Sequence, residues 1–299
     1  MKKNKNLPNF FIIGAPKCGT TSLYYYLKKH PNIFLSYYKE PYFFATDFPD
    51  KARLFSKKDK YLKECFKGAK NYKIIGEASA CYLYSKKAVP NILKLNPEAK
   101  FIAMIRNPVD MARSLYFQLK NSLKFRENAK SFKKAWDLQG ERRKGKKIPK
   151  HCKAPQLLQY GKVCKLGEQI KRLLKTVPNE NQVKIIRLEQ IKKEPEKVYR
   201  QILDFLDLEY DGRTKFPVHN KSNKVRSILI KRIMHIIYIA LRPIIKKIKQ
   251  ITNTEKWNLS CWNKVERKKP SLENNFKKKL ENYFKEDQKL LQTILKKKG

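Results

Sequence analysis

The segment over 10–23, FFIIGAPKCGTTSL, constrains the fold of this chain more than any other stretch of the sequence. Its apolar start is typical of a buried strand, and a short turn containing Gly14 and Gly19 leads into a helix expected over 20–29. In such a unit the turn and the first turn of the helix direct backbone N–H groups at the space beyond the strand, where they bind anions such as phosphate. The segment therefore predicts an anion-binding loop, with a plain connecting turn as the alternative.

The spacing of residues within this turn indicates which class of phosphate-binding loop it resembles. Gly14 and Gly19 have the separation of a G-x-x-x-x-G phosphate loop, but Thr20 and Thr21 follow the second glycine, where a Walker A loop has Lys and then Ser or Thr. The lysine of this turn lies inside it, at Lys17. A metal-dependent nucleotide triphosphatase is therefore disfavoured.

Short apolar segments alternate with helical segments along most of the chain. After the first strand, further strands are expected at Ile33–Leu35, Tyr72–Ile75, Phe101–Ile105 and Val183–Ile186. Helices are expected at Val89–Leu95, Pro108–Lys120, Leu166–Thr176 and Pro195–Leu206. This alternation predicts the α/β class, with a P-loop-like central parallel sheet flanked by helices.

Composition divides the chain into three expected parts: a core over 1–220, a basic amphipathic cap or appendage over 221–270, and a helix over 271–299 that packs on the core, with Ser271 as its N-cap. The stretch from Lys124 to Lys153 is rich in charge and poor in periodicity, which indicates a long surface excursion or a mobile flap near a site.

A second anion site is expected where the strand at 101–105 ends. Arg106 follows that strand, Asn107 is a good N-cap, and Pro108 suits the first helical position. A guanidinium beside a helix N-terminus binds anions, and Ser114, two turns later, can add a hydroxyl. The alternative is that Arg106 pairs a carboxylate in a purely structural role.

The charge of the chain agrees with anionic partners. Its 70 Lys and Arg residues exceed its 26 Asp and Glu residues, for a formal net charge of +44. Nucleic acid, an anionic membrane surface and an acidic ligand all fit this excess, as does a coding bias toward lysine. A content of 41% hydrophobic residues excludes a wholly disordered chain.

At this point the sequence resembles a known family. The stretch Pro16–Leu23 is similar to the 5′-phosphosulfate loop of sulfotransferases that use 3′-phosphoadenosine-5′-phosphosulfate (PAPS). The stretch Ile105–Tyr116 resembles their second signature, in which an arginine and a serine hold the 3′-phosphate of the nucleotide; Arg106 and Ser114 match these positions. The resemblance implies a PAPS-dependent enzyme with the region over 1–220 as its PAPS-binding core.

The same resemblance assigns roles within the first loop. The ammonium group of Lys17 would stabilise negative charge on the leaving phosphate during in-line sulfuryl transfer, and no metal ion is required. The residues expected to hold the 5′-phosphate are Lys17, Cys18, Gly19, Thr20, Thr21 and Ser22.

A third segment, Ser36–Phe44, resembles the K-E-P segment of the carbohydrate and heparan-sulfate branch, in which the glutamate is the general base. Glu40 occupies that position and would take the proton of an acceptor hydroxyl or amine. The alternative is an exposed loop carboxylate that pairs with Lys39. The acceptor implied by this branch is a carbohydrate.

Weaker similarity extends through Gly76–Leu83, where Ala78 and Ala80 replace the Lys and Pro common in the family's acceptor-facing segment. The resemblance therefore leaves acceptor recognition open at this segment.

The sequence leaves two other functions open: a kinase-like P-loop enzyme, and a basic module on an inactive nucleotide fold that binds RNA or a membrane surface. Specific nucleic-acid binding is not expected. The most apolar later stretch, Ile228–Leu241, contains Lys231, Arg232 and His235 and is too short to span a membrane. The short apolar run near the start does not resemble a signal peptide, and the cysteines have no disulfide or zinc spacing, so a cytoplasmic location is expected, with peripheral contact to anionic membranes as an alternative.

Overall fold

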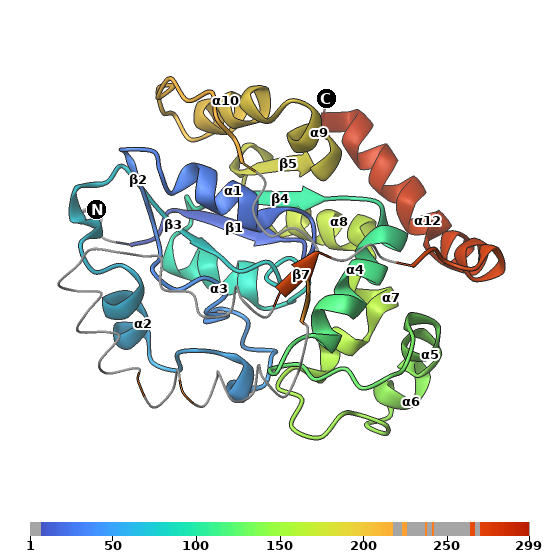
Figure 1. The fold of residues 1–299 in the computed structure, drawn as a ribbon. Coiled ribbons are helices and arrows are strands. Elements are labelled where there is room, and N and C mark those ends of the chain that lie inside the picture. Colours follow the sequence, from blue (N-terminus) through green and yellow to red (C-terminus); the bar gives the residue numbers. More distant parts are fainter. Residues whose placement is uncertain are drawn as a thin grey trace.

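A computed structural model describes residues 7–217, 223–225, 237, 241, 264–266 and 270–298 of the chain. Its centre is a sheet of five parallel strands in the order β2-β3-β1-β4-β5 (Figure 1). The strands are β1 (Phe10–Gly14), β2 (Ile33–Leu35), β3 (Ile74–Ala78), β4 (Lys100–Ile105) and β5 (Val183–Arg187). The first four are almost wholly buried, as expected for parallel strands covered on both faces. The predicted α/β class with a parallel sheet is confirmed.

The third strand differs from its predicted bounds at both ends, because pairing with its two neighbours sets where it begins and ends. The third strand begins at Ile74 rather than Tyr72, because its pairing with β2 starts with Ile33 opposite Ile74. It also continues beyond Ile75 to Ala78, because β1 pairs with it as far as Ile12 opposite Ala78. The sequence prediction missed this second half of β3, which contains a charged residue, Glu77.

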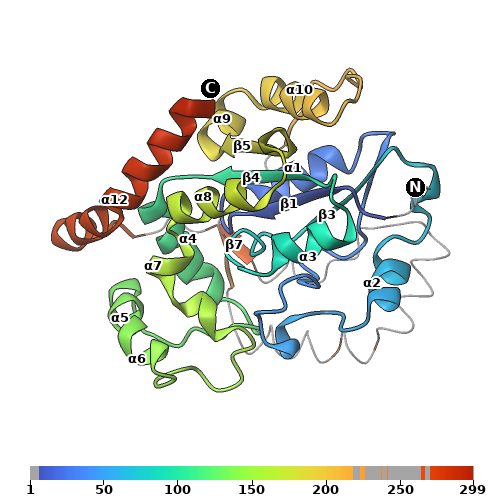
Figure 2. The same cartoon turned by 180° about the vertical axis from the view of Figure 1, so that it is seen from behind.

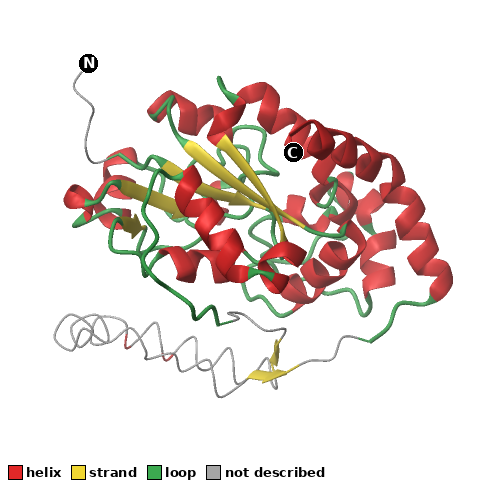
Figure 3. Cartoon of the chain, turned by 90° about the horizontal axis from the view of Figure 1, so that it is seen from above, coloured by secondary structure: helices red, strands yellow, loops and turns green. Residues whose placement is uncertain are grey.

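Helices cover both faces of the sheet, with the strands between them (Figure 3). The chain passes from β1 through α1 (Thr20–Leu27) to β2, and in the opposite direction from β3 through α3 (Ala88–Leu95) to β4. Because crossover connections are right-handed, α1 and α3 lie on opposite faces. Helix α8 (Leu166–Thr176) contacts α3 and lies on its face of the sheet (Figure 2).

The structure describes further helices around this central unit. They are α2 (Lys58–Cys65), α4 (Pro108–Lys120), α5 (Phe132–Asp137), α6 (Gln139–Arg143), α7 (Tyr160–Val163), α9 (Leu188–Lys193) and α10 (Pro195–Phe205). A separate antiparallel pair joins β6 (Asn223–Val225) to β7 (Lys264–Glu266).

The last helix, α12 (Asn274–Lys298), lies along α8 and α4 and buries Phe276, Leu280 and Phe284 (Figure 1). Its buried Asp287 accepts hydrogen bonds from the backbone N–H groups of Gly167 and Glu168, at 2.9 and 2.8 Å. The carboxylate therefore caps the start of α8 from a distant part of the chain. The predicted N-cap at Ser271 is wrong, because α12 begins three residues later.

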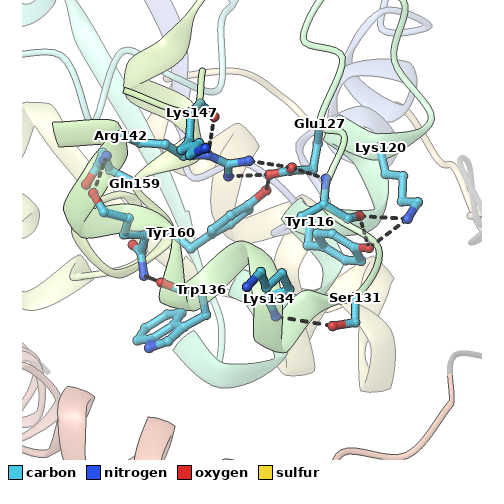
Figure 4. Close-up of polar contacts among 12 residues, drawn as sticks. Tyr116, Lys120, Glu127, Ser131, Lys134, Trp136, Arg142, Lys147, Gln159 and Tyr160 are labelled. Carbon is cyan, nitrogen blue, oxygen red and sulfur yellow. Dashed lines mark hydrogen bonds and ion pairs between the residues drawn. The ribbon is translucent and has the colours of Figure 1, made fainter. Parts of the chain in front are cut away.

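The segment over 124–153, whose composition indicated a long surface excursion or a mobile flap near a site, is tied to the core by buried side chains. It contains α5 and α6, and a buried ion pair joins two of its residues that are 15 positions apart (Figure 4). Arg142 donates through Nη1 and Nη2 to the two carboxylate oxygens of Glu127, at 2.6 and 2.7 Å, and both side chains are fully buried. Tyr160 of α7 donates to the same carboxylate at 2.5 Å. This network fixes the segment against the core.

The expected basic appendage over 221–270 lies almost entirely outside the described residues, as does the amphipathic stretch within it. Across the helices that the structure describes, none is both long enough and apolar enough to cross a bilayer.

Candidate active site

The carboxyl ends of β1, β2, β3 and β4 meet at one edge of the sheet, because the strands are parallel. Lys17 follows β1, Glu40 follows β2 and Arg106 follows β4. The guanidinium Nη1 of Arg106 donates to the backbone oxygen of Lys17 at 3.2 Å. The structure therefore brings the three residues that the sequence singled out to a common edge.

The turn after β1 has the backbone geometry of a tight anion loop. Gly19 has φ 89° and stands at the N-cap of α1, where no side chain caps the helix. A Cβ at this position would lie 2.7 Å from Cδ1 of Leu188, so the Leu188 side chain would have to shift, and the left-handed conformation itself favours glycine. Lys17 also has a positive φ, 65°, which is uncommon for a residue with a side chain. Such backbone strain concentrates at functional sites.

Lys17 lies in a cationic environment. Burial lowers the pKa of its ammonium group, and the positive charges of Arg106 and Lys39 lower it further, while Glu40 acts in the opposite direction. This shift makes the group a weaker base than an ordinary lysine. An anion bound between Lys17 and Arg106 would oppose the shift.

Cys18 differs from its neighbours in the loop, because its thiol faces the protein interior. Sγ lies 3.6 Å from the backbone oxygen of Pro16 and 3.8 Å from the sulfur of Met111, and burial raises the pKa of the thiol to about 12. The Cys18 side chain is therefore part of the core and is not a reactive thiol.

The start of α4 is built as the sequence predicted. The Asn107 side chain accepts hydrogen bonds from the N–H groups of Val109 and Asp110, at 3.0 and 3.2 Å, and Pro108 is the first helical residue. Ser114 lies on the same helix and is buried.

Arg106 is only partly satisfied by the protein. Its Nη2 reaches a carboxylate oxygen of Asp110 at 3.5 Å, and the Asp110 side chain is 56% exposed. Its Nε is buried and has no hydrogen-bond partner among the described residues. The structural ion pair considered from the sequence therefore exists, but it leaves one buried N–H donor unsatisfied, which is rare in folded proteins.

Glu40 is held at its backbone and at both carboxylate oxygens. Its N–H donates to Ala78 O at 2.9 Å, and its Oε2 accepts from the N–H of Ala80 at 2.9 Å. Its Oε1 lies 2.9 Å from Nζ of Lys39, and 27% of the Glu40 side chain is exposed. The contact with Lys39 considered from the sequence is present, and the carboxylate still lies at the edge that holds Lys17.

A lysine that the sequence did not single out also reaches this edge. Lys124 donates to Ala52 O at 2.8 Å and lies over the Tyr42 ring, with Nζ 4.5 Å from the ring centroid. Burial lowers the pKa of Lys124, whereas Cys81 and Glu40 act to raise it. Its position in a lysine-rich segment gave no signal of this contact. Over the described part of the chain, no group of three or more His, Cys, Asp or Glu side chains could hold a metal ion.

A comparison with protein families agrees with this arrangement. The model of the sulfotransferase domain matches residues 7–293. The chain belongs to the sulfotransferase family.

Several known sulfotransferases are similar to it. The membrane-associated sulfotransferase kil1 of Dictyostelium discoideum is 36% identical over 37% of this chain and 22% of its own length. Carbohydrate sulfotransferase 15 of Mus musculus is 32% identical over 38% of this chain and 28% of its own length. The similarity thus spans less than a third of either relative.

A solved structure matches more of the chain. The sulfotransferase of Alicyclobacillus acidocaldarius is 28% identical and has a TM-score of 0.62, and the match covers 86% of this chain and 98% of that one. The sulfotransferase fold therefore extends over most of the described residues.

Proposed function

We propose that this sulfotransferase moves the sulfuryl group of PAPS to a hydroxyl, or an amine, of a carbohydrate-type acceptor. The observation that supports PAPS as the sulfuryl donor is that the Nε of Arg106 is buried and has no hydrogen-bond partner in the part of the chain that the structure describes. A phosphate oxygen would give this N–H the acceptor that the protein lacks, and the adjacent N–H groups of a guanidinium suit two phosphate oxygens. Arg106 is thus the proposed contact to the 3′-phosphate, with the Ser114 hydroxyl from α4 beside it in the sequence signature.

The turn after β1 is the proposed site for the 5′-phosphosulfate. The N-terminus of α1 begins in this turn, and no side chain caps it. Bound PAPS supplies an activated sulfuryl group attached to a phosphate. Arg106 donates to the backbone oxygen of Lys17, and its charge acts on the buried Lys17 ammonium group. This ammonium group would stabilise the negative charge that develops on the leaving phosphate oxygen.

Glu40 is the proposed general base. Its carboxylate accepts hydrogen bonds from Lys39 and from Ala80, and the Tyr42 side chain also hydrogen-bonds to it, which fixes its direction. An ionised carboxylate can accept about four hydrogen bonds, so a lone pair remains for the proton of an acceptor. Carbohydrate sulfotransferase 15 is among the similar proteins, and together with the K-E-P segment this supports a carbohydrate acceptor.

Replacement of Glu40 by glutamine tests this function. Transfer of label from radiolabelled PAPS to a panel of neutral and uronate-containing oligosaccharides would first identify the best acceptor. With that acceptor, Glu40→Gln should lower kcat about 10²- to 10⁴-fold, because a general base contributes about that much. Calorimetry should show nearly unchanged binding of adenosine 3′,5′-bisphosphate (PAP).

Glu286→Gln is the matched control, because Glu286 is a strongly exposed carboxylate on α12. It should keep wild-type turnover. Wild-type turnover in Glu40→Gln would exclude Glu40 as the base.

A further inference from the structure

The residues that follow β3 hold the Glu40 turn in place. We call residues 78–82 the β3 exit and residues 40–44 the Glu40 turn. Ala78 accepts from the N–H of Glu40, and Ala80 donates from its N–H to the Glu40 carboxylate. The general base is therefore fixed at its backbone and at its side chain by one short stretch of the neighbouring strand.

Two side chains of the β3 exit hold the rest of the turn. Ser79 Oγ accepts from the N–H of Tyr42 at 3.3 Å, and the hydroxyl of Tyr82 accepts from the N–H of Phe44 at 3.3 Å. Both hydroxyls belong to buried residues. Backbone N–H groups on alternate residues of the Glu40 turn thus find their acceptors on the β3 exit.

The Glu40 turn needs this support because its backbone is strained. Glu40 has φ 61° and Tyr42 has φ 56°, and neither is a glycine. A left-handed residue with a side chain costs on the order of 1 kcal/mol, and it persists only where the surroundings impose it. Loss of the contacts to the β3 exit would let the turn relax and displace the Glu40 carboxylate.

A buried carboxyl group directly precedes the β3 exit in the chain and takes no part in the proposed reaction. Glu77 is fully buried in β3, and its Oε2 accepts from the hydroxyls of Tyr61, at 2.6 Å, and Tyr82, at 3.1 Å. The Ser79 side chain of the β3 exit also acts on this carboxyl group and lowers its pKa, while Oε1 has no partner within hydrogen-bond geometry among the described residues. A buried carboxyl with an unpartnered oxygen is costly to maintain, which is expected where it serves function rather than stability.

We propose that Glu77 is a positioning residue for Glu40, and that it acts through the Tyr82 hydroxyl; this rests on the proposed role of Glu40. A tyrosine hydroxyl has one proton. When Tyr82 donates that proton to Glu77, its oxygen lone pairs are left to face Phe44 N–H. Glu77 thus orients the Tyr82 hydroxyl so that its oxygen accepts from Phe44 N–H and holds the far end of the Glu40 turn in place.

Substitutions at Glu77 separate this role from simple packing. Glu77→Met keeps an unbranched side chain of similar length but removes the acceptor, so it should lower kcat about tenfold or more, since small displacements of a reacting group have effects of this size. Glu77→Gln retains a carbonyl oxygen that accepts from both tyrosines and should restore most of the turnover. PAP binding should change less than about twofold in both, because Arg106 and Lys17 are untouched.

Tyrosine variants provide a milder test if Glu77→Met does not fold. Tyr82→Phe removes the hydroxyl that accepts from Phe44 and should lower kcat severalfold. Tyr160→Phe is the matched control, because it removes a buried hydroxyl that donates to a different buried carboxylate, Glu127. The proposal requires Tyr82→Phe to lower kcat more than Tyr160→Phe does at equal loss of thermal stability.

A double-mutant cycle with Glu40→Gln decides whether Glu77 acts through Glu40. If it does, Glu77→Met should have little further effect on kcat in the Glu40→Gln enzyme. An equal loss in both backgrounds, or no loss from Glu77→Met in the wild-type background, would overturn the positioning role. Wild-type turnover in Glu40→Gln alone would instead overturn the proposed function, so the two failures are distinguishable.

Discussion

Replacement of Arg142 by methionine should destabilise the protein strongly, although Arg142 lies in a stretch whose composition resembles a solvated loop. The guanidinium donates twice to Glu127 and once, through Nε, to Lys147 O at 3.3 Å (Figure 4). Methionine fills much of the same space but leaves the Glu127 carboxylate buried without its counter-charge. The effect measured is therefore the cost of an unpaired buried charge.

The magnitude follows from the contacts that remain. Breaking a buried ion pair by removing one partner costs about 3–5 kcal/mol. Glu127 would keep the hydroxyl of Tyr160 and the N–H of Ala129, at 2.5 and 2.8 Å, so the lower end of that range applies. A loss of about 3 kcal/mol corresponds to a fall of about 6 °C in Tm for a chain of this size.

The pH dependence gives a second signature. Burial acts to raise the pKa of Glu127, but the hydrogen bonds from Arg142 and Tyr160 outweigh it and hold the pKa below the ordinary 4.5. A carboxyl with a lowered pKa contributes stability above its unfolded-state pKa and loses it as the pH falls through the folded-state value. Without Arg142, burial raises the pKa of Glu127, and the unfolded chains titrate alike. The difference between wild type and Arg142→Met should therefore shrink as the pH falls from that raised pKa to the lowered pKa of the wild type.

Chemical denaturation and thermal scans at several pH values measure these quantities. Lys133→Met is the control, because its ion pair with Asp137 lies in the same segment with side chains 57% and 39% exposed. An exposed pair of this kind contributes only about 0–1 kcal/mol. A loss in Arg142→Met no larger than that in Lys133→Met, or one that does not depend on pH, would refute the reasoning.

Three further predictions address the nucleotide site, the last helix and the buried carboxyl. Arg106→Ala should weaken PAP at least about tenfold in calorimetry, because a charge-assisted contact is worth about 1.5–3 kcal/mol, and should leave AMP nearly unchanged; equal weakening of both would place Arg106 elsewhere. Asp287→Ala should lower the free energy of unfolding by about 1 kcal/mol, because it removes the cap on Gly167 and Glu168, and an unchanged unfolding curve would contradict that role. Burial raises the pKa of Glu77 to about 7 from the ordinary 4.5, so the protein should lose about 3 kcal/mol of stability as the pH rises from 4.5 through 7, where the buried carboxyl ionises. Glu77→Gln should remove this dependence of the free energy of unfolding on pH, and a variant that keeps the wild-type slope would show that Glu77 is not its source.

Local signals explain what the sequence could predict. The bounds of α4, Pro108–Lys120, were predicted to the residue, because Asn107 and Pro108 specify the start of a helix through their own side chains. The strands of the sheet were found because parallel strands buried on both faces are continuous apolar runs. The positions of Lys17 and Arg106 followed from these elements, since both lie where a strand ends.

Contacts between distant residues explain what the sequence could not predict. The pairing of Glu127 with Arg142 spans 15 residues and that of Asp287 with Gly167 spans 120, and no periodic pattern marks either pair. The bounds of α2, α5, α6, α7 and α9 were missed as well. Glu77 is a further case, because a charged residue inside a strand argues against burial until its tyrosine partners are placed beside it.

Binding of PAP compared with binding of ATP and Mg²⁺ tests the proposed function most directly. A ligand that binds only the folded protein raises its stability by an amount that grows with ligand concentration, about 2.7 kcal/mol at 100 times its Kd. PAP without metal should raise Tm in this way and give a single-site isotherm in calorimetry, while ATP with Mg²⁺ at equal concentration should do neither. Stabilisation by ATP and Mg²⁺ with no response to PAP would contradict a PAPS-dependent sulfotransferase.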